Sequence, residues 1–209
     1  GVHWGYFAAG FAAVAVAFPA IWALGDKFIL NQDQKNRFLA ILYPDLYAKN
    51  EAFQQNRGIG AIGSGQFFGQ GLFNGNYTQS GAVPENQNDF VFSVAGEELG
   101  FIGAIAVLVL LAAIILRIVI NGKRANDNAS YLMCMGMASM LAAQVIINIG
   151  MVLQWLPVIG ITLPFFSAGG SSNLCVYIGI GLMMSIYRFN QKTPVANFRL
   201  QRVVTRFST

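Results

Sequence analysis

Two acidic residues four positions apart, Glu85 and Asp89, stand just before a long apolar run in this 209-residue chain. Two further acids, Glu97 and Glu98, follow inside that run. An ionisable group at the edge of a hydrocarbon layer is costly unless it is paired, hydrated or used. A carboxylate there can act as a general base on a hydroxyl, coordinate a divalent cation or simply solvate its loop. Position alone favours solvation, because acidic side chains are mostly exposed.

The composition is that of a polytopic membrane protein. Hydrophobic residues make up 55% of the chain and charged residues only 11%, which exceeds the apolar share of an ordinary soluble domain. Four apolar runs are long enough to cross a hydrocarbon core of about 30 Å as helices, at residues 5–24, 94–120, 129–156 and 172–187. A fifth, glycine-rich run at residues 59–73 is predicted to cross within a bundle. The predicted fold class is therefore all-α, with about five transmembrane helices.

Lysine and arginine residues orient these spans, because cytoplasmic loops carry an excess of positive charge. From Arg188 onward the tail (188–209) holds basic residues and no acid, which predicts a cytoplasmic C-terminus. Alternation then predicts the side of each loop: inside for Lys123 and Arg124, outside for residues 157–171 and 74–92, and inside for residues 26–57. Asp89 is thus expected outside, and Arg57 near the inner end of the fifth span.

The remaining bulk features exclude several classes of function. The formal charge of +4 comes mostly from the tail and inner loops, so it indicates topology and contact with anionic lipid rather than nucleic-acid binding. Cys134 and Cys175 fall in apolar spans, which argues against a disulfide or a metal site. The chain begins without a methionine or a signal-peptide pattern. We expect a single membrane domain over residues 1–209 that lacks an N-terminal portion, and we expect this fragment alone to be inactive.

Polar groups within the apolar sequence suggest an internal cavity. Gln144 and Asn148 are four residues apart in one span, so both amides project from one helix face. Residues 156–172 are apolar but contain prolines and glycines that forbid a regular helix, which predicts a re-entrant segment lining a cavity. Residues 169–172, Gly-Gly-Ser-Ser, then open the last helix, where backbone amides can attract a phosphate or simply be capped.

Three sequence blocks carry a family resemblance: AIGSGQFFGQGL at residues 61–72, PENQNDFVFSVAGEELG at residues 84–100, and NIGM through SAGGSS within residues 148–172. In this order and spacing the blocks resemble the SEDS family (shape, elongation, division and sporulation), which includes RodA- and FtsW-type proteins. The resemblance implies the C-terminal half of a roughly ten-helix membrane fold in the bacterial cytoplasmic membrane. It also implies an enzyme that polymerises lipid II into glycan strands outside that membrane.

The resemblance further implies which residues carry the chemistry. Asp89 matches the family's essential aspartate in the large exterior loop, 74–92, and is the expected catalytic residue. A base is needed there because the acceptor hydroxyl must lose a proton as it attacks the sugar carbon that bears the undecaprenyl pyrophosphate. Substrate contacts are expected from ten further residues: Arg57, Ser64, Gly65, Glu85, Glu98, Asn148, Gly169, Gly170, Ser171 and Ser172.

Partners and rival functions complete the expectations. The resemblance implies lipid II, membrane lipids and a class B penicillin-binding protein transpeptidase as partners, with no nucleic acid. No cofactor is established by the sequence, and a divalent cation, Mg²⁺ or Mn²⁺, stays open because Glu85 and Asp89 do not make a complete ligand set. Gln70 and Ala168 replace a lysine and a tyrosine of many family members, and neither change touches Asp89. The rival functions are a transporter that flips lipid-linked precursors and a non-catalytic scaffold of a cell-wall assembly.

Overall fold

The computed structural model describes residues 53–83 and 87–192, together with isolated positions between residues 5 and 43. Glu85, most of the predicted span 5–24 and the tail beyond residue 192 lie outside the described residues. No strand occurs in the described part, which agrees with the expected all-α class. Its helices are α3 (Phe53–Gly65), α4 (Asn76–Gln79), α5 (Val91–Glu98), α6 (Gly100–Lys123), α7 (Asn128–Val152) and α8 (Gly170–Lys192).

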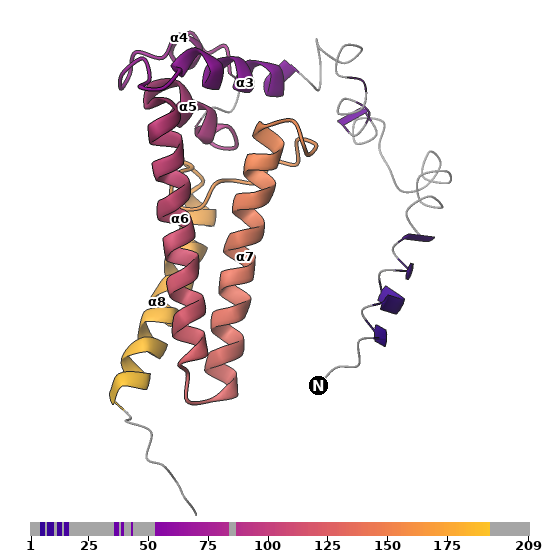
Figure 1. The fold of residues 1–209 in the computed structure, drawn as a ribbon, viewed down its shortest axis with the longest axis vertical. Helices are drawn as coiled ribbons and strands as arrows, with labels where there is room; N and C mark the ends of the chain where they lie inside the picture. The colour runs from indigo at the N-terminus through magenta and orange to yellow at the C-terminus, as the bar shows by residue number, and fades with distance from the viewer. Residues whose placement is uncertain are drawn as a thin grey trace, which may run out of the picture.

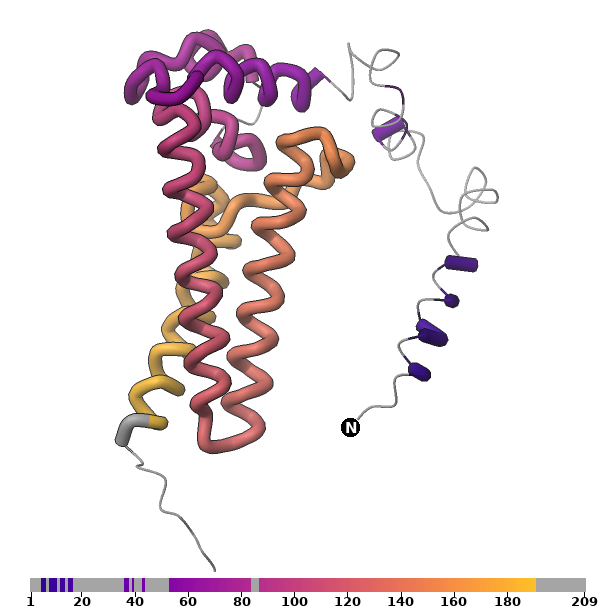
Figure 2. The backbone as a smooth tube through the Cα atoms, in the orientation of Figure 1, coloured from indigo at the N-terminus to yellow at the C-terminus, as the bar shows by residue number. Residues whose placement is uncertain are grey.

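Three long helices form the body of the molecule (Figure 1). α6, α7 and α8 run along its long axis, and α3, α4 and α5 gather at one end, which we call the α3 end. Each long helix is long and apolar enough to cross a membrane, over Gly100–Lys123, Asn128–Val152 and Gly170–Asn190. Three of the predicted spans are thus confirmed as candidate membrane helices. Figure 2 shows the tight turn that joins α6 to α7 at the end opposite α3.

At the end of the bundle opposite α3, small side chains let the long helices pack closely against one another. A Cβ on Gly122 of α6 would lie 2.7 Å from the Cβ of Cys134 on α7, so only glycine fits this contact. The side chain of Asn121 donates a hydrogen bond to the carbonyl of Met183 on α8 (2.9 Å). Cys134 is buried in a shared apolar core of Ile118, Cys134, Ala138, Leu141, Val176 and Met183.

An aspartate marks the start of α7. Asp127 precedes the helix in an extended conformation, and its carboxylate accepts a hydrogen bond from the N–H of Ser130 (2.8 Å). This bond satisfies one of the N–H groups that a helix start leaves unpaired. The same backbone bond from Ser130 lowers the pKa of Asp127 from its ordinary value.

The predicted span 94–120 proves to be two helices. α5 ends at Glu98, and Gly100 adopts a φ of +71° before α6 continues. A side chain at Gly100 would overlap the backbone of Gly69 and Phe67, so the break depends on glycine. The second acid pair, which the sequence placed inside the membrane run, therefore belongs to α5 and not to the membrane-length helix.

Backbone carbonyls cap the first turn of α6. The N–H of Phe101 donates to the carbonyl of Gln66 (2.8 Å), and the N–H of Ile102 donates to that of Phe67 (3.3 Å). Gln66 adopts a φ of +49° immediately after α3 ends. The turn that ends α3 thus supplies the acceptors for the start of α6, which joins these two helices directly.

The prediction of a fifth span at residues 59–73 is wrong. α3 has 13 residues and stops at Gly65, so it is about 20 Å long, shorter than a hydrocarbon core of about 30 Å. Beyond it the chain turns repeatedly through positive φ angles, at Gly69, Gly71 and Phe73. α3 lies across the ends of the long helices (Figure 1). The expected position of Arg57 near the inner end of the fifth span rested on this crossing, and Arg57 lies instead within the short helix α3.

Close contact between α3 and α5 gives a first testable prediction. A Cβ on Gly65 would overlap the carbonyl oxygen of Gly96 and lie 2.8 Å from the Cα of Glu97. Because backbone atoms cannot move aside cheaply, we expect Gly65→Ala to destabilise the protein by about 1–3 kcal/mol. The midpoint of thermal unfolding in detergent micelles measures this loss.

Gly63→Ala is the matched control, because Gly63 lies on the same helix and a Cβ there meets no atom within 4 Å. We expect this variant to unfold at the wild-type temperature or slightly above it, since alanine favours helix. Equal midpoints for the Gly65 and Gly63 variants would contradict the close contact.

Candidate functional site

Asp89 lies in the turn of residues 87–90 that leads into α5. Its side chain is partly buried and faces the irregular segment between α7 and α8, residues 153–169. The Oδ2 atom of Asp89 is 3.4 Å from the point where a Cβ would sit on Gly160, and Gly160 has a φ of +79°. Glycine at this position lets the backbone of the segment approach the carboxylate.

Three consecutive carbonyl groups hold the backbone at Asp89 in place. The carbonyl of residue 87 accepts from the backbone N–H of Ala168 (2.8 Å), and that of residue 88 accepts from the hydroxyl of Ser167 (2.6 Å). The carbonyl of residue 89 accepts from the side-chain amide of Asn148 (2.8 Å). Ser167 is 3% exposed and its oxygen also accepts from the N–H of Leu163 (2.8 Å). We call these three bonds the carbonyl clamp. They fix the turn to α7 and to the segment before α8.

Asn148 joins two loops with one amide group. Its Nδ2 atom donates to the carbonyl of Asp89 and also to the carbonyl of Ile161 (2.7 Å). The side chain has no exposed surface, and its Oδ1 atom is buried without a hydrogen-bond partner in the described part of the chain. Gln144, predicted to share this face, likewise has a buried and unpaired Oε1 atom there. Both donor hydrogens of Asn148 are therefore used to position backbone.

The start of α8 is tied to the same segment. The hydroxyls of Thr162 and Ser172 lie 2.9 Å apart, and the side chain of Asn173 donates to the carbonyl of Ser167 (2.7 Å). Gly170 and Ser171 are exposed. Among the described residues, no hydrogen bond uses the N–H groups of residues 170–172. The structure thus brings six expected site residues into one region: Asp89, Asn148, Gly169, Gly170, Ser171 and Ser172.

Ser64 and Gly65 lie in a second cluster at the end of α3. The hydroxyl of Ser64 donates to the carbonyl of Ala61 (2.7 Å) and, more weakly, to the Glu97 carboxylate (3.4 Å). Sequence reasoning chose Glu98 as the site residue of the acid pair and left out Glu97. Adjacent acids in an apolar run were the available signal, but the sequence could not show which side chain points inward.

The other expected contacts are more dispersed. Arg57 is exposed, and its guanidinium carbon lies 5.2 Å from the centre of the Phe53 ring. Glu98 is 8% exposed, and within residues 53–83 and 87–192 no hydrogen bond or ion pair engages its carboxylate. Neither side chain makes a described contact with Asp89.

Sequence reasoning did not select Arg37. Its guanidinium donates to the carbonyl of Val158 (3.0 Å), in the segment that also carries Gly160. A basic residue is therefore in contact with the segment that faces Asp89. Apart from Arg57, residues 26–57 offered only a charge pattern for orienting the spans, and a long-range contact of this kind leaves no local pattern.

A metal site is not assembled by the described side chains. In that part of the chain, no three histidine, cysteine, aspartate or glutamate residues stand together in a way that could hold a metal ion. Asp89 can supply carboxylate oxygens, and its predicted neighbour Glu85 lies outside the described residues. Any ion here would need most of its oxygen ligands from elsewhere.

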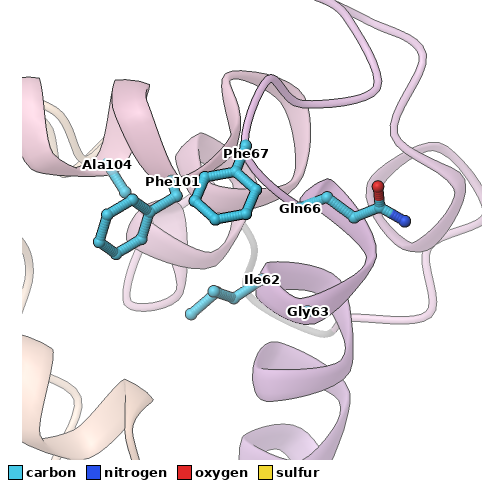
Figure 3. A pocket seen from close by; sticks show the side chains of 6 residues that line it. All are labelled: Ile62, Gly63, Gln66, Phe67, Phe101 and Ala104. Atoms are coloured by element: carbon cyan, nitrogen blue, oxygen red, sulfur yellow. The ribbon is translucent and has the colours of Figure 1, made fainter.

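An apolar pocket of about 520 Å³ opens between α3 and α6. Figure 3 shows the side chains that line it, with the rings of Phe67 and Phe101 next to one another. These rings meet edge to face, with centroids 6.1 Å apart. The lining residues are Ile62, Gly63, Gln66, Phe67, Phe101 and Ala104. The pocket offers an apolar surface and no acid or base.

Three helices of membrane-spanning length, with the Asp89 turn held against the segment between α7 and α8, are the features of a polytopic membrane protein. A family model described as cell cycle protein, for FtsW, RodA and SpoVE, matches residues 1–192. The chain belongs to this family, which is the SEDS family that its motifs resemble.

Sequence similarity to individual proteins supports the same family assignment. The peptidoglycan glycosyltransferase MrdB of Escherichia coli K12 is 33% identical over 187 residues, which are 90% of this chain and 50% of MrdB. A probable peptidoglycan glycosyltransferase FtsW of Lactococcus lactis is 34% identical over 206 residues, covering 94% of this chain and 48% of the relative. The chain thus spans about half the length of these curated relatives.

A solved structure has a fold similar to that of this chain. It belongs to a study of how a peptidoglycan synthase complex coordinates polymerization and crosslinking. The similar chain in that complex has 29% sequence identity and a TM-score of 0.70, and the match covers 91% of this chain and 51% of the other. The helical arrangement described above is therefore one that a known synthase complex contains.

The carbonyl clamp gives a second prediction. Asn148→Asp replaces both donor hydrogens with a carboxylate that faces two carbonyl oxygens, so we expect the turn at Asp89 to separate from the segment before α8. Hydrogen exchange measured by mass spectrometry should rise in peptides that cover residues 158–168. In that segment the amide of Ala168 belongs to the clamp, and the amide of Leu163 donates to the Ser167 hydroxyl.

Ser139→Ala is the control on the same helix, because Ser139 is exposed and its hydroxyl bonds only the carbonyl of Gly136 one turn back. This variant should leave exchange at residues 158–168 unchanged. Unaltered exchange in Asn148→Asp would show that Asn148 does not hold the segment.

Proposed function

We propose that this protein is a peptidoglycan glycosyltransferase that polymerises lipid II at the outer face of the bacterial cytoplasmic membrane, with Asp89 as its catalytic residue. The observation that carries the proposal is the carbonyl clamp, which holds the Asp89 backbone beside the start of α8. The activity named for the relatives supports the reaction class.

Asp89 would act as the general base. An acceptor sugar hydroxyl gives its proton to the carboxylate while its oxygen attacks the anomeric carbon of the donor. The new glycosidic bond forms as the bond from that carbon to the undecaprenyl pyrophosphate breaks, and the electron pair leaves with the pyrophosphate. A clamped backbone suits this step, because a base contributes only where it is held within hydrogen-bond reach of the proton.

The pyrophosphate needs donors that stabilise its growing negative charge. The exposed start of α8, Gly169 to Ser172, offers first-turn N–H groups that no carbonyl in the described part of the chain uses, together with the positive end of the helix dipole. Arg37 brings a positive charge to this segment through its hydrogen bond to the carbonyl of Val158. We assign the leaving group to this region. Arg57, Ser64, Gly65, Glu85, Glu98 and Asn148 stay predicted as substrate contacts.

A divalent cation, Mg²⁺ or Mn²⁺, is compatible with this arrangement when the substrate brings most of the ligands. Mg²⁺ commonly binds through one or two carboxylates together with substrate phosphates. Asp89 and the pyrophosphate oxygens would supply such a set, and the ion would neutralise charge on the leaving group.

Orientation and partners follow the same proposal. Lys123 is the last residue of α6 and Arg124 follows it, while Arg188 lies near the end of α8. These helix ends lie at the end of the bundle opposite α3 (Figure 1). This distribution supports a cytoplasmic C-terminus and an outward-facing Asp89. The similar synthase complex supports a crosslinking partner, which we take to be a class B penicillin-binding protein.

The proposal predicts that Asp89→Asn abolishes polymerisation. Asparagine keeps the size of the side chain and the main-chain carbonyl of the clamp, but it cannot take a proton. Glycan-strand formation from purified lipid II, measured on gels with the cognate transpeptidase present, should fall by at least about a hundredfold.

Asp127→Asn is the matched control, because Asp127 lies between α6 and α7 at the opposite end and asparagine caps a helix equally well. This variant should keep wild-type activity. Full activity in a folded Asp89→Asn protein would remove Asp89 from the mechanism. No polymer from the folded wild-type complex would instead favour a precursor transporter or a scaffold.

The assignment of the leaving group predicts the effect of a charge at the start of α8. Ser171 is exposed in the first turn, where aspartate stabilises the helix itself through the dipole. We expect Ser171→Asp to raise the KM for lipid II about tenfold by repelling the pyrophosphate, while the unfolding temperature is kept or raised. Ser171→Ala should change KM less than threefold. A KM unaffected by the aspartate would place the pyrophosphate elsewhere.

A further inference from the structure

Glu97 carries a buried carboxyl group that the reaction proposed above does not use. Its side chain has no exposed surface, although it lies in the last turn of α5. The carboxylate accepts hydrogen bonds from the N–H of Tyr77 (2.7 Å), the N–H of Thr78 (2.9 Å) and the hydroxyl of Thr78 (2.6 Å). The hydroxyl of Ser64 lies 3.4 Å away. One side chain thus connects α5 to α3 and to α4.

The surroundings are shaped to fit this carboxylate. A Cβ on Gly75 would lie 2.8 Å from the Glu97 carboxyl carbon, so the chain can approach only as glycine. The main-chain carbonyl of Glu97 also accepts from the N–H of Gln70 (2.9 Å). We call residues 66–81, which include α4, the α4 lobe. Glu97 therefore holds the α4 lobe at two places: its main-chain carbonyl bonds Gln70, and its carboxylate bonds Tyr77 and Thr78 in α4.

The charge of Glu97 depends on these donors. Within the described residues, no lysine or arginine forms an ion pair with it, and its donors at the start of α4 are two backbone amides and the Thr78 hydroxyl. A buried carboxylate without a cation is stable only when hydrogen bonds replace its lost hydration. Loss of the carboxylate would leave the backbone N–H groups of Tyr77 and Thr78 without their acceptor, and an unpaired N–H group that faces the protein interior lowers stability.

α5 connects this cluster to the candidate catalytic turn. The helix is eight residues long and begins two residues after Asp89. The carbonyl clamp holds the chain just before its first turn, and Glu97 lies in its last. Gly100, with its positive φ, interrupts the path to α6. Along its length α5 packs on α3, where a Cβ at Gly58 would be 2.9 Å from Ser93 and 3.0 Å from Phe90.

We propose that Glu97 is a positioning residue for Asp89. By bonding the α4 lobe and the end of α3, its carboxylate fixes the far end of α5 and so the direction from which Asp89 meets the substrate. This proposal rests on the function proposed above, because it assigns Glu97 a role in the same reaction. It differs from a purely structural role in acting on kcat within the folded protein.

The test compares Glu97→Gln and Glu97→Ala with wild type, each purified in lipid nanodiscs with the cognate transpeptidase. Hydrogen exchange of peptides covering residues 66–81 reports the lobe, and lipid II polymerisation per folded molecule reports kcat and KM. We expect faster exchange at the lobe in both variants, more in alanine than in glutamine, because glutamine keeps one acceptor oxygen. We expect kcat to fall roughly tenfold to a hundredfold in alanine and less in glutamine, with KM within about threefold of wild type.

Gln79→Ala is the control within the lobe, since Gln79 is exposed on α4 and its side chain makes no hydrogen bond in the described part of the chain. It should leave exchange and kcat unchanged. Faster exchange with an unchanged kcat per folded molecule would overturn the positioning role, and unchanged exchange would overturn the contact itself. Failure of the proposed function is distinct, because wild type would then make no polymer while the exchange difference persisted.

Discussion

The candidate site depends on the need to satisfy backbone carbonyls in a turn that has no helix to satisfy them. Residues 87–89 present three carbonyl groups in succession, and each finds a donor from a different kind of group: a backbone amide, a hydroxyl and a side-chain amide. Because buried carbonyls are costly when unpaired, these donors also determine where the turn can lie. The buried polar side chains of Asn148 and Ser167 follow from that single requirement.

Sequence patterns predicted most of what depends on hydropathy. The three long helices, the all-α class and the irregular stretch rich in proline and glycine after α7 all follow from composition and periodicity. The family motifs directed attention to Asp89 and to the start of α8, which the structure places around a common segment. Gln144 and Asn148 were expected to need internal partners, and Asn148 has them in two carbonyls.

What the sequence did not predict depends on backbone angles and long-range contacts. The run at residues 59–73 has the small residues of a packed span, but positive φ angles end the helix at Gly65 and turn the chain back on itself. A break at Gly100 is equally invisible to hydropathy, because the glycine sits within a continuous apolar run. Choosing between Glu97 and Glu98 required knowing which side of a short helix faces α4, and the contact of Arg37 with Val158 spans 121 residues.

Two membrane-length helices begin on the side of the bundle where α3 lies, and their starting turns differ in electrostatic character. At α6 the positive end of the helix dipole meets the carbonyls of Gln66 and Phe67, which belong to the negative end of α3, so the two partial charges largely cancel. The start of α8 meets no such carbonyls in the described part of the chain. The first-turn amides of α8 therefore stay available to an anion, whereas the amides of Phe101 and Ile102 in α6 are already bonded to carbonyls.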